Sequence, residues 1–243
     1  MRFLIALLSV CVLSFSIHAE DTLNDTQQEE VRKLVRETLL TNPEIIMEAM
    51  QVLQAKQQEQ QSQMQKLALD DIRKNKLESA ITPTGGNPKG NVTLVEFFDY
   101  QCGYCKRAFP GVMEVINSDQ NIRYVFKEFA ILGPESEIAA RAALAAKKQG
   151  KYMDFHIAMM EVNGRLSEDK ILRTAESVGL EIKKLQEDMK SDEVTEEIVS
   201  TREIAQRLNI SGTPAFIIGD EIIPGAVPPE TLKEAIKQQR EKS

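Results

Sequence analysis

The strongest hydrophobic pattern lies in the middle of the chain. Residues 92–98 are apolar at all but two positions, which predicts a buried strand, and apolar residues then recur at helical spacing over 102–117. A second apolar run at 122–129 predicts another strand. Two strands joined by a helix of this length form a parallel βαβ unit with a right-handed crossover.

The pattern is helical throughout the segment from 137 to about 208, which we interpret as an insertion at about 133–208. Strand character then returns in two short runs, separated by Gly219 and Asp220 as a two-residue hairpin turn, and an amphipathic helix begins at Pro229. The clearest helical pieces are 139–146, 170–178 and 193–208, and the two short strands are 215–218 and 221–223.

The chain before this region predicts two helices. Apolar residues recur at helical spacing over 26–40, and Asn42 with Pro43 then marks the start of a longer helix, with Asn42 as N-cap. That helix has one apolar edge near a 3.5-residue repeat, which must pack on the main domain or on another copy of the chain. We expect a homodimer formed through residues 28–80; a helix folded back on the domain is the alternative. The edge consists of Ile46, Met50, Leu53, Met64 and Leu67.

The first nineteen residues have the features of a cleavable signal peptide. Arg2 is followed by an apolar run at 3–17, and the segment ends at Ala19. The run is shorter than the roughly 20 residues of a membrane span. Cys11 falls inside the segment expected to be removed. The predicted division is a signal peptide at 1–19, a helical oligomerisation extension at 20–81, a Pro- and Gly-rich linker at 82–91, and an α/β domain at 92–243.

The charge of the chain argues against nucleic acid as a partner. Removal of Arg2 with the signal peptide leaves 29 of the 30 basic residues against 37 acidic ones, a formal charge of about −8. Phosphate binding requires a concentrated basic surface, which this balance does not favour.

Cys102 and Cys105 are the only cysteines after the predicted cleavage site. A bridge between residues three apart removes little entropy from the unfolded chain, so structural stapling is a weak explanation. The pair follows a strand and opens a helix, where free amide groups and the helix dipole favour a thiolate. Cys102 is therefore expected to attack a disulfide, and Cys105, one turn further on, to resolve the mixed disulfide.

Other uses of a Cys-x-x-Cys pair fit less well. A structural zinc site needs about two further Cys or His ligands, and only His156 remains outside the signal peptide; a site shared by two chains stays open. Haem attachment needs His after the second cysteine, where this chain has Lys106. We expect no metal and no cofactor. His156 lies in a Met-rich helical segment and is expected to serve packing.

From residue 92 onward the sequence resembles the DsbA family of periplasmic disulfide oxidoreductases. The resemblance is carried by Glu96 six residues before Cys102, by Pro110 eight residues after it, and by Gly212-Thr213-Pro214 before a strand. It implies an α/β thioredoxin fold with a helical insertion, preceded here by the long-helix extension. It also implies a buried carboxylate at Glu96, and a cis-proline loop at Thr213 and Pro214 that binds substrate backbone.

The Cys102-Gly103-Tyr104-Cys105 centre is similar to that of DsbC-type isomerases, which are dimers built on an N-terminal extension. Over nearly the whole chain the sequence also resembles the 27 kDa Com-type proteins of intracellular bacteria. Gly103, Tyr104 and Glu96 are therefore predicted to tune the redox pair. Lys127 on the neighbouring strand is a candidate partner for the Glu96 carboxylate.

These observations favour a protein disulfide oxidoreductase acting on exported proteins in the periplasm, with isomerase or reductase work favoured over oxidation. The resemblance implies a membrane redox partner of the DsbB or DsbD type. The alternatives are a DsbA-type dithiol oxidase only, a non-redox periplasmic holdase, and a copper or zinc carrier that uses the thiolates at a dimer interface.

Overall fold

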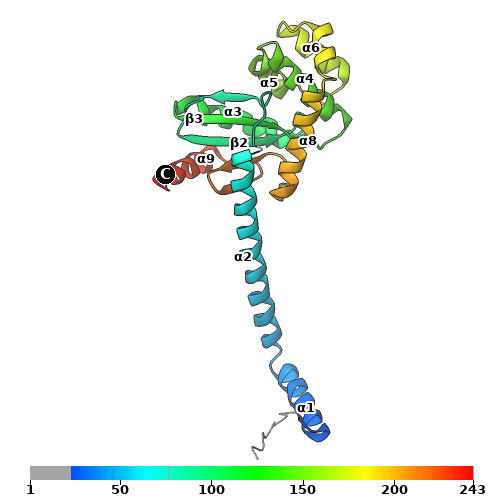
Figure 1. The fold of residues 1–243 in the computed structure, drawn as a ribbon, viewed down its shortest axis with the longest axis vertical. Helices are drawn as coiled ribbons and strands as arrows, with labels where there is room; N and C mark the ends of the chain where they lie inside the picture. Colours follow the sequence, from blue (N-terminus) through cyan, green and yellow to red (C-terminus); the bar gives the residue numbers. More distant parts are fainter. Residues whose placement is uncertain (1–22, 76, 243) are drawn as a thin grey trace, which may run out of the picture. The chain divides into compact units, whose positions relative to one another are not determined.

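The computed structural model describes residues 23–75 and 77–242 (Figure 1). The predicted signal peptide, including Cys11, lies outside the described residues. The chain divides into two compact units, Met1–Gln58 and Glu59–Ser243.

A five-stranded sheet forms the centre of the second unit, in the order β1-β3-β2-β4-β5. The parallel pairing of β2 with β3 across α3 confirms the predicted βαβ unit, and Gly219 with Asp220 forms the predicted turn between β4 and β5. The strands are β1 (Thr84–Gly86), β2 (Val92–Phe98), β3 (Ile122–Glu128), β4 (Ala215–Ile218) and β5 (Glu221–Pro224), and the connecting helix is α3 (Gly103–Ser118).

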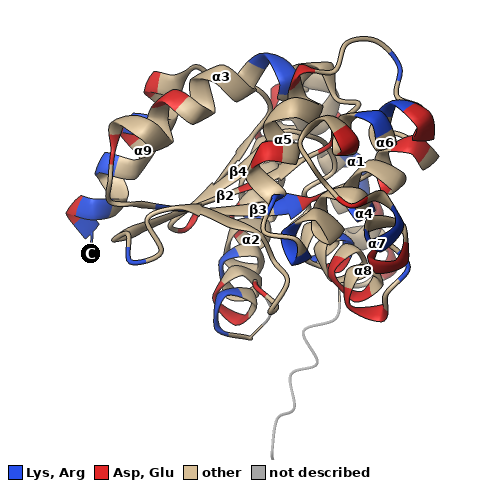
Figure 2. Ribbon diagram, turned by 90° about the horizontal axis from the view of Figure 1, so that it is seen from above, with Lys and Arg blue, Asp and Glu red and all other residues tan. Residues whose placement is uncertain are grey.

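The two faces of the sheet bury different helices. Figure 2 shows α3 and α9 (Pro229–Lys242) on one side of the strands, with α2 (Glu44–Asn75) and α8 (Asp192–Arg207) on the other. Side chains alternate along a strand, so neighbouring residues of β2 enter different cores. Leu94 and Phe98 pack with α3 and α9, whereas Val95 and Phe97 pack with the ends of α2 and α8.

The predicted linker at 82–91 contains the edge strand β1, which pairs antiparallel with β3, so the prediction is wrong at 84–86. The two glycines that suggested a flexible segment are needed for close packing. A Cβ at Gly85 would lie 3.1 Å from the Phe126 ring, and Gly86 has φ +63° with the Ile122 carbonyl 2.5 Å from the position of a Cβ.

Five helices lie between β3 and β4, in the segment that the sequence marked as helical. The three clearest predicted pieces fall in α4, α6 and α8, while α5 and α7 were not singled out. The long run of small residues in α4 is buried between its neighbours. The remaining helices of the block are α4 (Pro134–Lys148), α5 (Tyr152–Glu161), α6 (Glu168–Ser177) and α7 (Ile182–Asp188).

The two N-terminal helices are α1 (Asp25–Thr41) and α2. Asn42 ends α1 and was wrongly predicted to begin α2: its side-chain amide donates to the Thr38 carbonyl at 3.1 Å. The last turns of α2 bury Leu69 and Ile72 against the sheet, because these residues lie on the side of the helix that faces the core. All five residues of the predicted apolar edge are exposed. None of the helices described here is apolar over a length that could cross a membrane.

A buried ion pair fastens the segment after α2 to the sheet. Lys127 Nζ on β3 donates to a Glu197 carboxylate oxygen on α8 at 2.7 Å and to the Leu77 carbonyl at 3.1 Å. Glu197 also accepts hydrogen bonds from the hydroxyls of Ser79 and Thr82 at 2.6 and 2.8 Å. These four hydrogen bonds satisfy the polar atoms of the ion pair, as a buried pair requires.

Candidate redox site

Cys102 is the N-cap of α3 and is only 5% exposed. Its sulfur accepts a hydrogen bond from the Cys105 amide at 3.3 Å, which satisfies one of the free amide groups at the start of the helix. Its thiol also lies 3.2 Å from the Thr213 carbonyl, to which it donates when protonated. The predicted reactive sulfur therefore lies between a helix N-terminus and the predicted substrate loop.

The environment of Cys102 favours its ionised form. A hydrogen bond from the Cys105 thiol is the main cause that lowers the pKa of Cys102 to about 5, well below the usual value of a cysteine. Burial opposes this shift, while the Thr213 side chain and the amides of Cys105 and Tyr104 add to it. At neutral pH the outer sulfur is an anion and can act as a nucleophile.

Cys105 has the opposite character. Its side chain is fully buried, and burial raises its pKa above the ordinary value, with further increases from the hydrogen bond to Cys102 and from the charge of Glu96. The inner thiol stays protonated while the outer one ionises. Stepwise disulfide exchange requires this arrangement, in which one sulfur is a nucleophile and the other stays protonated until the mixed disulfide has formed.

The loop before β4 carries Thr213 and Pro214, joined by a cis peptide bond. Pro214 is buried beside the redox pair, and its carbonyl accepts from the Gly225 amide at 2.8 Å, which fixes the loop to the end of β5. A cavity of about 300 Å³ adjoins this loop; Thr213 and Pro214 line it, and Cys102 does not.

Glu96 is buried under the pair and accepts a hydrogen bond from the Tyr124 hydroxyl. Burial raises the pKa of Glu96 to about 7; the bond from Tyr124 lowers it, and the charge of Cys102 raises it. Lys127 is not its partner, and that prediction is wrong. Because side chains alternate along β3, Tyr124 and Phe126 face Glu96, whereas Lys127 points to the opposite face and pairs with Glu197.

The two residues between the cysteines differ in what they contribute. The Tyr104 ring is 63% exposed and has the Arg107 guanidinium 4.4 Å from its centre, so it is the Tyr104 amide, not its ring, that affects the sulfur. At Gly103 an added Cβ would meet only Arg107, at an ordinary 3.5 Å. Space alone therefore does not require glycine there.

Asp99 is a site residue that the sequence reasoning missed. Its buried carboxylate accepts hydrogen bonds from the amides of Gln101, Ile131 and Leu132 at 2.7 to 2.9 Å, and from the Ser136 hydroxyl at 2.8 Å. These bonds tie the turn before Cys102 to the loop that leads into α4. A carboxylate at the end of an apolar strand was the only signal in the sequence.

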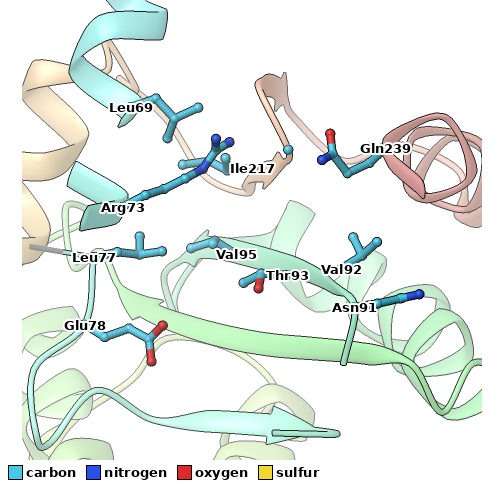
Figure 3. A pocket seen from close by; sticks show the side chains of 11 residues that line it. Leu69, Arg73, Leu77, Glu78, Asn91, Val92, Thr93, Val95, Ile217 and Gln239 are labelled. Atoms are coloured by element: carbon cyan, nitrogen blue, oxygen red, sulfur yellow. The ribbon is translucent and has the colours of Figure 1, made fainter. Parts of the chain in front are cut away.

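Another cavity, of about 360 Å³, lies between the end of α2 and α9 (Figure 3). Val95 and Ile217 form part of its floor, and the Arg73 and Glu78 side chains lie near its rim. Val95 on β2 and Ile217 on β4 face the side of the sheet opposite to Glu96. None of the residues predicted for the redox site lines this cavity.

Comparison with known proteins agrees with this geometry. The sequence profile described as a DSBA-like thioredoxin domain matches residues 93–237. The chain belongs to the DSBA-like thioredoxin domain family. A second profile, described as the copper resistance protein ScsC N-terminal domain, matches residues 27–60. The DSBA-like domain thus contains every residue predicted for the redox site.

Solved structures of DSBA-like proteins superpose on this chain. A thioredoxin-like oxidoreductase from Silicibacter pomeroyi is 45% identical with a TM-score of 0.66, covering 67% of this chain and 94% of its own. Proteus mirabilis ScsC is 31% identical with a TM-score of 0.67, covering 91% and 100%. The thiol-disulfide exchange protein alpha-DsbA2 from Wolbachia pipientis is 29% identical with a TM-score of 0.68, covering 73% and 96%.

Several curated relatives of this chain are longer proteins, and the match covers only part of each. The Na(+)/H(+) antiporter NhaA 1 of Salinispora arenicola is 30% identical over 153 residues, which are 62% of this chain. The chain spans about a quarter of the length of such relatives, 24% in this case.

The hydrogen bond from the inner thiol can be tested by comparing two variants of the DSBA-like domain. Cys105→Ala removes the donor, so the pKa of Cys102 should rise well above about 5, whereas the hydroxyl of Cys105→Ser still donates and should hold it lower. The ultraviolet absorbance of the thiolate, followed against pH, measures both. Equal midpoints in the two variants would show that this bond does not govern the ionisation.

Proposed function

We propose that this DSBA-like protein exchanges disulfides with exported proteins through Cys102 and Cys105, and that isomerase or reductase work exceeds oxidation. The observation that carries the proposal is the opposite ionisation of the two thiols: the pKa of Cys102 is lowered to about 5 at the helix start, and that of buried Cys105 is raised. The structural similarity to a thioredoxin-like oxidoreductase and to a thiol-disulfide exchange protein supports the same chemistry.

The residues suit a two-step exchange. The Cys102 thiolate attacks a substrate disulfide, forming a Cys102–substrate disulfide and releasing one substrate thiolate. In isomerisation that thiolate attacks another substrate disulfide, and a final substrate thiolate releases the enzyme unchanged. In reduction Cys105 loses its proton and attacks the Cys102 sulfur, so that the pair is oxidised and the substrate is reduced by two electrons.

Glu96 is suited to accept the Cys105 proton. It lies on the same face as the pair, its charge acts on Cys105, and its pKa of about 7 places both protonation states within reach near neutral pH. Thr213 and Pro214 are suited to hold the backbone of the substrate beside Cys102, because the Thr213 carbonyl lies 3.2 Å from the sulfur.

Insulin reduction and the refolding of scrambled ribonuclease test the chemistry directly. Cys102→Ser should abolish both activities, because it removes the attacking sulfur. Cys105→Ser should lose insulin reduction and accumulate a mixed disulfide that gel electrophoresis without reductant detects. Full activity of Cys102→Ser in both assays would contradict the proposal, whereas a wild type that is inert in both would favour the non-redox holdase.

Glu96→Gln separates a catalytic from a structural carboxyl. We expect the release of the mixed disulfide by Cys105 to slow on the order of 10²-fold at pH 7. Because the folded-state pKa of Glu96, about 7, exceeds the usual 4.5, the stability that its neutral form gives is present below about 4.5 and is lost as pH rises through 7. The variant should therefore melt above the wild type at pH 8 and close to it at pH 4.

Release kinetics and thermal melting of the reduced protein supply the two readouts. The exposed Glu203→Gln, on α8, is the matched control and should change neither. A variant that releases substrate at the normal rate would remove Glu96 from the proton transfer, even if its stability changed as expected.

A predicted leader and the periplasmic family resemblance support a periplasmic site of action, with a membrane redox partner of the DsbB or DsbD type. Mostly oxidised Cys102–Cys105 in cells would favour the oxidase alternative over isomerase work. A copper or zinc carrier is the remaining alternative, and metal analysis of the reduced protein tests it.

Self-association through α1 and the first part of α2 is proposed from their exposed apolar side chains. Leu34 and Val35 are 65% and 52% exposed, and the ScsC N-terminal profile covers this segment. Leu34→Glu with Val35→Glu should convert the proposed homodimer to a monomer in sedimentation, because a charge cannot be buried there without a partner. Gln28→Glu is the control. An unchanged oligomer would place the interface elsewhere.

A further inference from the structure

Helix α5 of the helical block makes two polar contacts with the segment that carries the redox pair. The first joins His156 of α5 to Tyr100, which lies in the turn just before Cys102. The second joins Lys106, the residue after Cys105, to the C-terminal end of α5.

The first contact centres on a buried hydroxyl. Tyr100 Oη lies 2.9 Å from His156 Nδ1 and donates to a Glu128 carboxyl oxygen at 3.1 Å. Tyr152 at the start of α5 donates to the same oxygen at 2.8 Å. With Tyr100 Oη as acceptor from His156 Nδ1–H, one chain of hydrogen bonds runs from α5 through the turn to β3. The turn continues into the Cys102 amide, which donates to the Asp99 carbonyl at 3.0 Å.

The contact with Tyr100 is the one hydrogen bond that the His156 side chain makes among the described residues. It is fully buried, burial lowers its pKa to about 3, and its Nε2 atom has no hydrogen-bond partner. The ring is neutral, and aromatic rings surround it, including Phe109 of α3 with centroids 5.4 Å apart. An apolar ring would fill this space without leaving a buried nitrogen unpaired. The bond to Tyr100 is what the histidine adds.

The second contact caps a helix. Lys106 Nζ donates to the Met159 carbonyl at 3.3 Å and to the Val162 carbonyl, both at the end of α5. These carbonyls are among those that a helix leaves unpaired at its C-terminus, where a positive charge is also favoured. The first turn of α3 is thereby held against the C-terminal end of α5.

We propose that α5 positions the redox pair from within the helical block, with His156 and Lys106 as positioning residues that fix the turn before Cys102 and the first turn of α3. Neither side chain touches substrate or the reacting sulfur. They act through the backbone, by keeping the Tyr104 and Cys105 amides aimed at the Cys102 sulfur. That this positioning matters for disulfide exchange rests on the proposed function. Its effect on the ionisation of the Cys102 sulfur does not.

The test compares two replacements of His156 in the full chain. His156→Phe keeps the ring and the packing but removes the bond to Tyr100. His156→Asn loses the ring but places a polar atom near the position of Nδ1. If the bond positions the turn, Phe should reduce the rate of Cys102 alkylation at pH 5 by about threefold or more, because thiolate stabilisation by the amides weakens. Asn should restore part of that rate despite its poorer packing.

Lys106→Met and Lys106→Gln extend the test. Both remove the charge, but the Gln amide can still donate to the carbonyls at the end of α5. If the capping contact matters, the rate of Cys102 alkylation should fall less in Lys106→Gln than in Lys106→Met. Ile157→Ala, on the exposed side of α5, is the matched control and should leave alkylation unchanged. Thermal melting of every variant separates loss of fold from loss of positioning.

The proposal is overturned if His156→Phe ionises and alkylates as the wild type does, or if Asn falls further than Phe in both stability and rate. Alkylation needs no protein substrate, so the outcome is independent of insulin reduction. If the wild type does not reduce insulin, but the His156 variants still change the rate of Cys102 alkylation, the proposed function is refuted and the positioning role of His156 stands.

Discussion

The hydrogen bonds that converge on the Cys102 sulfur are the interactions on which the rest of the site depends. A sulfur anion that is only 5% exposed is stable because the start of α3 supplies amide donors and the Cys105 thiol supplies another. The βαβ unit places that helix start at the end of β2, and the Asp99 carboxylate holds the turn between them. Without these donors, burial would favour the neutral thiol.

The face of the sheet beneath α3 buries two carboxyl groups, and tyrosine hydroxyls donate hydrogen bonds to both. Glu96 with Tyr124, and Glu128 with Tyr100 and Tyr152, alternate with large apolar side chains beneath α3. Burial raises the pKa of both carboxyl groups, so each can hold a proton near the pair without adding charge to the core. The opposite face places its buried charges in the Lys127–Glu197 pair, which fixes chain geometry and lies away from the sulfur.

Much of this could be predicted from the sequence, and the failures have physical causes. The strands β2 and β3, the helix that begins at Cys102 and the hairpin at Gly219 follow from local apolar patterns and turn residues. The strand β1 was missed because its three residues are held by pairing with β3 and by glycine packing, neither of which appears in a local pattern. Lys127 was misassigned because being on a neighbouring strand says nothing about the face to which a side chain points.

The contribution of His156 was hidden for a related reason. In the sequence it is a lone histidine among methionines, and only the fold brings it to Tyr100, which lies 56 residues away.

The opposite ionisation of the two thiols can be measured directly from the carbon-13 shifts of the two cysteine Cβ atoms in the reduced protein as a function of pH. The account predicts that Cys102 titrates at about pH 5 while Cys105 stays protonated beyond the titration of ordinary cysteines. Two thiols that titrate together at the pKa of free cysteine, about 8.5, would contradict it.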